Sequence, residues 1–403
     1  MSHSSNVKLR SLIDGSNPSA AARAFRLFAL PFSITYSLIV RGRNFAYDIK
    51  LVKSQRASRP VVSIGNITMG GVGKTPFVAW LTDYITSLGK NVALISRGYK
   101  AKAQQGLLES QREFFDSLSW VIKSRAIEPE SRRFFHFNDE ACELALRFPE
   151  TPYFLDSSRI EAAKAVTRLA PETDALILDD AFQHRQISRD LDVVLLDALL
   201  PFGGGRVAPA GYLREPVSEI KRADVVVLNR ADLISNSKRE EIKKCVVRYA
   251  PRAIWCEIAQ RPSFIMRRMV ESDGVRLRRE DFSQWQTEFH AFKPLAFCGL
   301  GAPQGFKETL LAARFPLASF MTFPDHCVYS RDDFLAINQA ANDLNADVVI
   351  TTMKDFVKLS GREPIDKPVV ALGIDVVFLT GETEFKQAIQ NVLNAPYDMP
   401  NKK

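Results

Sequence analysis

The segment TMGGVGKT at residues 68–75 constrains the fold of this chain more than any other feature. It follows the apolar run PVVSIGNI and precedes FVAWLTDYITSLGK, whose apolar residues have helical spacing. A strand, a glycine-rich turn and a helix in this order direct backbone N–H groups and the positive end of a helix dipole at one point, where a phosphate group binds. We therefore interpret the segment as a P-loop.

The residues of this loop that we expect to surround the phosphates are Thr68, Gly70, Gly71, Val72, Gly73, Lys74 and Thr75. Lys74 can reach the β- and γ-phosphates, and the Thr75 hydroxyl can bind Mg²⁺. The usual pattern, GxxxxGK[ST], has glycine where this chain has Thr68, so the loop is a variant. A glycine-rich turn with an incidental Lys-Thr pair is the alternative.

A P-loop enzyme also needs an acid at the end of a neighbouring strand to hold the metal ion. The run ALILDD supplies two, because four apolar residues of a predicted strand lead into Asp179 and Asp180. Ligands bind at the carboxyl edge of an open α/β sheet. We expect Asp179 to be a Mg²⁺ ligand that Asp180 assists; surface acids at a strand-ending turn are the alternative.

Strand and helix patterns alternate along most of the chain, and three apolar runs with acids at or near their ends are DALILDD, LDVVLLDA and ADVVVLN. This alternation predicts an α/β fold of the P-loop NTPase type, a parallel sheet with helices on both faces. A smaller α/β unit begins near residue 290, and a polar stretch at 101–135 resembles an insertion. The predicted ranges are a helical N-terminal segment (1–58), a P-loop core domain (59–260), a hinge or connecting ribbon (261–289) and a C-terminal α/β domain (290–403).

The N-terminal run LFALPFSITYSLIV at residues 27–40 has no charge and has arginines on both sides. It is shorter than the roughly 20 residues that span a bilayer core. No small-residue cleavage site follows it, so a signal peptide is disfavoured. A buried core helix and a helix in the bilayer interface both remain open. Pro31 argues against one continuous helix.

Composition excludes several classes of protein. The chain has 403 residues, 46% hydrophobic and 25% charged, which excludes disordered and collagen-like chains. The net charge of +8 favours anionic partners without selecting one. Five scattered cysteines without a CxxC pair indicate neither a disulfide framework nor a zinc site, and fit a reducing compartment. The sequence contains neither a basic helix nor an RNP-like strand, so a nucleic-acid partner is not expected.

The run Asn229-Arg230-Ala231-Asp232 follows an apolar strand and resembles a relaxed NKxD signature, which recognises guanine in GTPases. Arginine in place of lysine weakens the match, because the lysine stem packs over the base. A polar strand-to-helix turn is the alternative, so guanine specificity is a minor possibility.

Seven blocks in one order make the chain resemble the tetraacyldisaccharide 4′-kinase family, whose members phosphorylate a glycolipid of the lipid A pathway. The blocks are Gly65-Asn66 with TMGGVGKTP (68–76), SRGY (96–99), Asp139-Glu140, DDAFQH (179–184), Gly205-Arg206 with PAG (209–211) and LREP (213–216), FPDH (323–326), and TMKDFVK (352–358). Two departures are Met353, where the family usually has Glu, and the length of the 101–135 stretch.

The resemblance implies an ATP-dependent kinase that transfers the γ-phosphoryl group to the 4′-hydroxyl of a tetraacyldisaccharide 1-phosphate, with ATP and Mg²⁺ as cofactors. It implies a catalytic pair, His326 as base and Asp139 as the carboxylate behind it. Because Asp139 and His326 come from different units, the pair would assemble when the two units close. A surface loop histidine and a helix-start acid are the structural alternatives.

The resemblance also implies roles for four further residues, each of which can equally form a structural ion pair. Arg97 and Arg214 are candidates for phosphate contacts, because a guanidinium bonds phosphate bidentately. Gln183 is a candidate for the metal shell or the sugar, and Glu215 for the surroundings of the metal or nucleotide. Asp325, beside His326, can orient its ring or bind metal.

The family's membrane-associating helix favours the interfacial alternative for residues 27–40. We therefore expect a monomer that is peripheral or monotopic at the cytoplasmic face of the inner membrane. The partners would be the membrane surface and the glycolipid.

Two other functions are compatible with a GGVGKT loop. A membrane-cycling switch ATPase is one, although such switches carry a lysine just before the two glycines, where this chain has Met69. A non-enzymatic nucleotide-binding scaffold is the other, but it gives no reason for Asp139 and His326.

Overall fold

The computed structural model describes residues 19–97, 121–123, 139–271, 274–288, 291–301, 303–325, 327–359 and 365–397. Within these ranges the strands are β1 (Val61–Asn66), β2 (Val92–Ser96), β3 (Val121–Lys123), β4 (Tyr153–Leu155), β5 (Ala175–Asp179), β6 (Leu191–Asp197), β7 (Val225–Asn229), β8 (Ile254–Glu271), β9 (Gly274–Asp281), β10 (Pro294–Cys298), β11 (Ser319–Thr322), β12 (Val348–Thr352) and β13 (Val369–Thr380). The helices are α2 (Ala20–Asp48), α3 (Lys74–Ser87), α5 (Asp139–Arg147), α6 (Arg159–Leu169), α7 (Asn236–Tyr249), α8 (Phe282–Glu288), α9 (Pro303–Ala312), α10 (Arg331–Asp343), α11 (Met353–Phe356) and α12 (Glu382–Asn394), with short 3₁₀ turns η2 (Gly203–Gly205), η3 (Val217–Arg222) and η4 (Ala231–Leu233).

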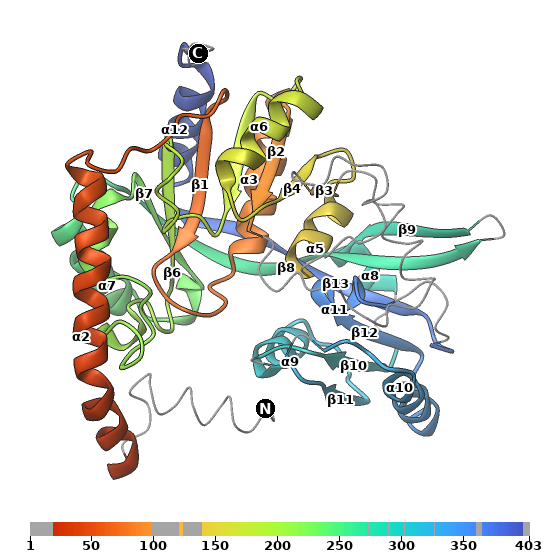
Figure 1. The fold of residues 1–403 in the computed structure, drawn as a ribbon. Helices are drawn as coiled ribbons and strands as arrows, with labels where there is room; N and C mark the ends of the chain where they lie inside the picture. The colour runs from red at the N-terminus through yellow and green to blue at the C-terminus, as the bar shows by residue number, and fades with distance from the viewer. Residues whose placement is uncertain are drawn as a thin grey trace.

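The described strands form one sheet in the order β11-β10-β12-β13-β8-β7-β6-β1-β5-β2-β4-β3, with β9 paired to β8 (Figure 1). From β3 to the start of β8 every pairing is parallel. The inner strands of this part are fully buried, because helices cover both faces. The predicted P-loop NTPase-type α/β sheet is confirmed.

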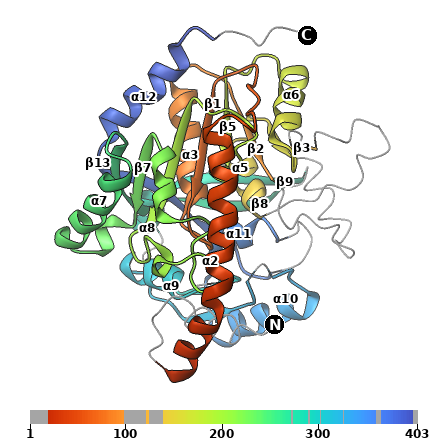
Figure 2. The same ribbon diagram turned by 60° about the vertical axis from the view of Figure 1, so that its left-hand side comes forward.

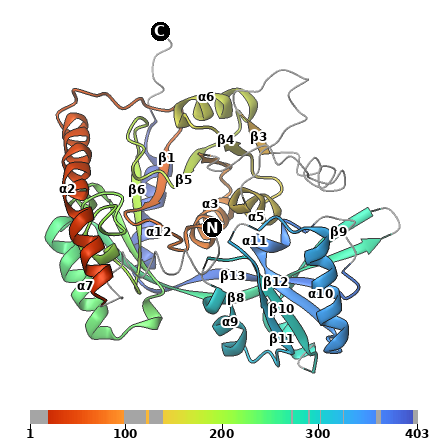
Figure 3. The same ribbon diagram turned by 60° about the horizontal axis from the view of Figure 1, so that its bottom comes forward.

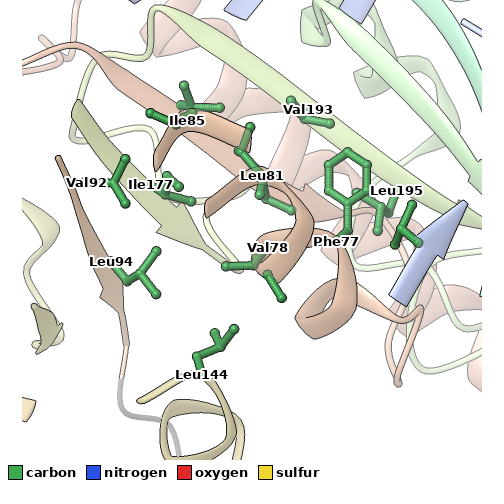
Figure 4. Close-up of a cluster of buried hydrophobic side chains, with 14 of the residues drawn as sticks. Phe77, Val78, Leu81, Ile85, Val92, Leu94, Leu144, Ile177, Val193 and Leu195 are labelled. Atoms are coloured by element: carbon green, nitrogen blue, oxygen red, sulfur yellow. The ribbon is translucent and has the colours of Figure 1, made fainter. Parts of the chain in front are cut away.

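Helices α3, α5 and α12 pack on one face of this first unit, and α6 and α7 pack on the other. Figure 4 shows how α3 contributes Phe77, Val78, Leu81 and Ile85 to a core that includes Ile177 of β5. This packing fixes the first turn of α3, and with it the glycine-rich loop, against the carboxyl edge of the sheet.

The second unit contains the parallel strands β11, β10, β12 and β13. Helices α10 and α11 cover one face, and α8 and α9 cover the other. Its departure from the family pattern, Met353, lies buried in this core. Strand β13 pairs antiparallel with β8 from Val370↔Arg267 to Thr380↔Glu257, and this joins the two units into one sheet.

The C-terminal end of the chain returns to the first unit. Val376, Phe385 and Ile389 lie in the core of the first unit, and the Phe385 ring stacks on Phe77 with centroids 5.6 Å apart. The predicted range 290–403 therefore includes a final segment that packs outside the second unit. The division of the chain into the four predicted ranges remains a prediction. All of 101–135 except β3 lies outside the described residues.

Helix α2 stands along the outside of the first unit (Figures 1 and 2), on the side away from the second unit (Figure 3). The expectation that Pro31 interrupts it is wrong, since the helix continues from Ala20 to Asp48. Pro31 is exposed, and the cost of about 3 kcal/mol for a mid-helix proline is offset by anchors on both sides. One anchor is Ser33, whose side-chain oxygen accepts a hydrogen bond from the Ala210 N–H at 2.8 Å. The buried residues of α2 form one stripe: Ala22, Ala29, Ser33, Val40 and Asn44.

Replacing Phe385 by Ala tests the return of α12 to the first unit. Because Phe385 is fully buried against Phe77, we expect the substitution to lower the free energy of unfolding by about 3–5 kcal/mol. Phe28→Ala makes the same chemical change on a ring that is 71% exposed and should change stability by less than about 0.5 kcal/mol. Urea unfolding followed by circular dichroism measures both; equal effects would contradict this packing.

Candidate active site

The glycine-rich loop has the backbone geometry of a phosphate-binding loop. Gly70 and Gly73 have φ angles of +100° and +76°, a region that side chains other than glycine's rarely adopt. Gly73 caps α3 in the left-handed conformation, and a Cβ there would overlap the side-chain amides of Asn229 and Gln260. The loop therefore places its N–H groups and the start of α3 around one point, which fits an anionic ligand.

Neighbouring side-chain amides hold this loop in place. Asn229 at the end of β7 donates from Nδ2 to the Val72 carbonyl at 2.8 Å, and Gln260 of β8 donates to the Gly73 carbonyl at 3.3 Å. Asn66 donates to the Thr68 carbonyl at 2.7 Å and to its hydroxyl at 3.2 Å. Thr68, the variant position, is thus buried and bonded, with no glycine conformation required.

The guanine-specific interpretation of residues 229–232 is not supported by these contacts. Asn229 is fully buried, its amide nitrogen bonds the P-loop, and its oxygen accepts from the Arg230 N–H at 2.8 Å. Asp232 pairs with Arg261 at 2.6 Å. The segment is the polar turn that was the alternative, and its asparagine supports the P-loop.

Asp180 lies between two cations at the carboxyl edge of the sheet. Its Oδ1 is 3.1 Å from Lys74 Nζ, and Arg214 Nη1 donates to its Oδ1 and Oδ2 at 2.8 and 2.9 Å. Burial opposes the charged carboxylate, but Lys74 and Arg214 outweigh it and lower the pKa of Asp180 to about 2. Asp180 adopts φ +50°, a strained conformation that is common at functional sites. Lys74 also donates to Asn66 Oδ1 at 3.2 Å.

Asp179 has the opposite electrostatic environment. Its side chain is buried, and its Oδ1 has no hydrogen-bond partner among the described residues. Burial and then the charge of Glu140 raise the pKa of Asp179 to about 7. A buried carboxylate oxygen without a partner, beside the P-loop, fits a cation-binding role.

The donor set fits Mg²⁺ in particular. The described residues contain no group of three or more His, Cys, Asp and Glu side chains that could hold a metal ion. Mg²⁺ at nucleotide sites needs no such cage, because one or two protein oxygens, substrate phosphates and waters complete its shell. Asp179 with the Thr75 hydroxyl would supply the protein oxygens.

The remaining predicted residues of the nucleotide site differ in their surroundings. Gln183 donates to the Asn66 carbonyl at 2.9 Å, so it borders the P-loop. Arg97 follows β2 and is exposed. Glu215 is completely buried, and its carboxylate accepts from Arg43, Asn44 and Arg222 at 3.0, 3.2 and 2.8 Å. These contacts favour a structural ion pair for Glu215, the alternative weighed for it.

Two polar side chains near the site, the half-buried Gln260 and the buried Arg159, were not predicted from the sequence as site residues. Gln260 lies within a long strand, and nothing in the local pattern distinguishes it. Arg159 is 1% exposed and donates to the carbonyl of Asp179 at 3.4 Å. The available signal was the position of Arg159 at the start of a predicted helix with apolar residues. A buried arginine there needs a nearby negative group, so it could have been expected to lie near the acids of the site.

The second half of the predicted site lies where α5 meets α11. Asp139 begins α5, and its Oδ2 is 3.0 Å from Lys358 Nζ of the second unit. His326 lies outside the described residues. Its neighbour Asp325 lies against Gly301, where an added Cβ would come within 2.9 Å of Asp325 Oδ2. An added Cβ on Gly299 would come within 3.1 Å of the Pro324 carbonyl and 3.0 Å of Asp355 Oδ1.

A parallel sheet with a P-loop, and an aspartate pair beside the P-loop lysine, define a P-loop nucleotide-binding enzyme. Comparison with known proteins specifies the family. The chain belongs to the tetraacyldisaccharide-1-P 4′-kinase family, whose model matches residues 25–394.

Relatives and solved structures agree with this assignment. A tetraacyldisaccharide 4′-kinase of Halothermothrix orenii is 34% identical over 363 residues, 88% of this chain and 89% of that protein. One of Pelobacter propionicus is 34% identical over 367 residues, 90% of this chain and 91% of that protein. The crystal structure of Aquifex aeolicus LpxK in complex with ATP matches with a TM-score of 0.65 and 27% identity, covering 92% of this chain and 99% of that one.

Gly73→Ala tests the geometry of the loop. The left-handed backbone alone costs an alanine roughly 1–2 kcal/mol, and the overlap with Asn229 and Gln260 adds to this. We expect a lower melting temperature and a loss of ATP affinity of more than tenfold. Gly71→Ala is the control for stability, because Gly71 has open space around it. Calorimetry and thermal melting measure the two effects; unchanged melting of Gly73→Ala would contradict the geometry.

Proposed function

We propose that this chain transfers the γ-phosphoryl group of ATP to the 4′-hydroxyl of a tetraacyldisaccharide 1-phosphate. The family match over residues 25–394 carries the proposal. The site agrees with it, because the P-loop and the acid pair stand at one edge of the sheet, where phosphoryl transfer requires them. The reaction forms a bond from the sugar oxygen to the γ-phosphorus, breaks the bond from that phosphorus to the leaving oxygen of ADP, and releases the hydroxyl proton to a base.

Residues of the first unit would bind the nucleotide. The loop N–H groups of 70–75 would surround the phosphates, and Lys74 would exchange Asp180 for phosphate oxygens. A Mg²⁺ ion held by Asp179 and Thr75, with Asp180 assisting, would neutralise charge on the phosphates. Asp180 contacts both Arg214 and Lys74 and so holds Arg214 beside the P-loop lysine. Arg214 is therefore better placed than Arg97 for a phosphate contact.

The acceptor hydroxyl would lose its proton to His326, with the Asp139 carboxylate behind the histidine. A chain of contacts leads from Asp139 into the second unit: Lys358 joins Asp139 to Asp355, and the Gly299 N–H donates to Asp355 Oδ2 at 3.0 Å. Gly299 in turn lies against Pro324, two residues before His326. Histidine suits the role of base near pH 7, and a carboxylate behind it stabilises the imidazolium.

The switch-ATPase alternative is not favoured by membership in this family. The lysine that is diagnostic of such switches would stand at position 69, where this chain has a methionine. The Met69 N–H bonds the Tyr212 carbonyl at 2.7 Å. A scaffold without activity is disfavoured by the ion pair that brings Asp139 to the second unit.

The family implies a membrane-associated protein, and α2 is the element that we propose to make the contact. By length and composition α2 could cross a membrane, although the uncharged run inside it had suggested a segment too short to span. Its buried stripe binds it to the first unit along its length, so we propose that it lies in the bilayer interface at the cytoplasmic face. Its exposed apolar residues include Leu27, Phe28, Phe32, Ile34, Leu38, Ile39 and Phe45.

The kinase assay tests the proposed reaction. Protein in detergent receives γ-labelled ATP, Mg²⁺ and a tetraacylated disaccharide 1-phosphate. We expect label in the lipid, and a fall in kcat of roughly 10²- to 10⁴-fold in Asp139→Asn and His326→Ala, because each removes part of the general base. ATP affinity should be unchanged in both. ATP hydrolysis stimulated by bare vesicles, without lipid labelling, would support the switch instead.

Vesicle binding tests the role of α2. We expect Phe28→Ala with Phe32→Ala to weaken sedimentation with anionic vesicles by about tenfold or more, because both rings are largely exposed. Leu311→Ala with Leu335→Ala removes comparable exposed side chains from α9 and α10 and should leave binding unchanged. Equal effects of the two pairs would argue against α2 as the membrane contact.

A further inference from the structure

The TMKDFVK segment of the second unit has no role in the reaction described above, yet its two lysines contact the first unit. Lys358 Nζ lies 3.0 Å from Asp139 Oδ2 and 3.3 Å from Asp355 Oδ1, and its side chain is only 13% exposed. Lys354 Nζ lies 3.2 Å from Glu140 Oε1. Two consecutive acids that open α5 are thus paired with two lysines four residues apart, where α5 packs on α11 (Figure 3).

The second unit fixes the position of Lys358 independently of Asp139. Its internal partner Asp355 is fully buried and accepts hydrogen bonds from the Gly299 N–H at 3.0 Å and the Thr352 hydroxyl at 2.7 Å. The Asp355 N–H in turn bonds the Thr352 oxygen at 3.1 Å, which caps α11. A buried carboxylate so held keeps its cation close, because separating them would leave a buried charge unpaired.

Other acidic side chains lie close to Asp139 on its own helix. Glu140 and Glu143 share the first turns of α5, and burial raises the pKa of Glu143 and, well above its ordinary value, that of Cys142. Burial opposes the charged form of Lys354, but the charges of Glu140 and Glu143 outweigh it and raise the pKa of Lys354. Lys358 is a cation in direct contact with Asp139.

We propose that Lys358 is a positioning residue of the kinase, which holds the Asp139 carboxylate at the edge of the second unit. The proposal rests on the role of Asp139 in the proposed function. Lys358 touches neither ATP nor the reacting atoms in this scheme. It sets where the carboxylate stands relative to the segment that carries His326, and it opposes the repulsion from Glu140 and Glu143.

Lys358→Ala tests the proposal through catalysis. We expect kcat to fall roughly 10- to 100-fold with the KM for ATP unchanged, since the P-loop is untouched. Loss of the cation disfavours the carboxylate, so the acidic limb of the kcat profile should move up by about 1 pH unit. Lys358→Arg keeps the charge and should restore most of kcat and the pH profile. Lys354→Ala is the matched control: it removes the adjacent ion pair and should leave the acidic limb in place.

A double-mutant cycle separates this proposal from the proposed function. If Lys358 acts through Asp139, Lys358→Ala should have no further effect on kcat in the Asp139→Asn background, and the two changes should be non-additive in melting temperature. Additive effects, or a wild-type pH profile for Lys358→Ala, would overturn the role of Lys358. A wild type that melts normally but labels no lipid would overturn the proposed function instead, and the melting cycle would still decide whether Lys358 and Asp139 act as a pair.

Discussion

The backbone hydrogen bonds along β8 hold the two halves of the molecule in one relation to each other. The first residues of β8, Ile254–Ile258, pair in parallel with β7, and the strand continues into antiparallel pairing with β13 up to Arg267. A sheet that is continuous across two units leaves little freedom between them, since any opening must break or twist this ladder. The irregular register at Gly373/Ile374 marks the point where β13 bends around the Phe264 ring. The acids of α5 and the lysines of the second unit meet because of this frame.

Charge within the site is divided by environment. Asp179 and Asp180 are neighbours in sequence, but no described residue bonds the buried Oδ1 of Asp179, whereas two cations bond Asp180, so their pKa values separate to about 7 and about 2. Asp180 is therefore a permanent anion that orders Lys74 and Arg214. The Oδ1 of Asp179 is left open by the described residues, which suits a ligand that brings its own positive charge.

The sequence predicted the central strands β1, β5, β6 and β7 and the P-loop, because these depend on local patterns. Buried parallel strands leave continuous apolar runs, and the glycines of the loop are required by its backbone angles at Gly70 and Gly73. The pairing partners were harder to predict. Asn229 was considered for base recognition, whereas it fixes the Val72 carbonyl, and no local pattern indicates that an amide at one strand end will reach a loop 157 residues away.

The same limit explains why other long-range contacts could not be predicted. Pro31 lowers helix propensity, but contacts such as that of Ser33 with Ala210 lie far apart in sequence and outweigh it. Glu215 was expected near the nucleotide because of its place in a motif, and its buried contacts with Arg43, Asn44 and Arg222 come from two other elements.

Helix α2 has exposed apolar side chains, but its C-terminal end is part of the protein interior. Asn44 donates to Glu215 at 3.2 Å and to Glu219 at 2.7 Å, and the Tyr36 hydroxyl donates to the carbonyl of Arg214 at 3.2 Å. A shortened protein, made without this helix to avoid detergent, would leave two buried carboxylates with fewer partners beside the arginine that holds Asp180. A protein made more soluble in that way would be altered at its nucleotide site. Inhibitors selected against the shortened form would therefore be selected against a different nucleotide pocket.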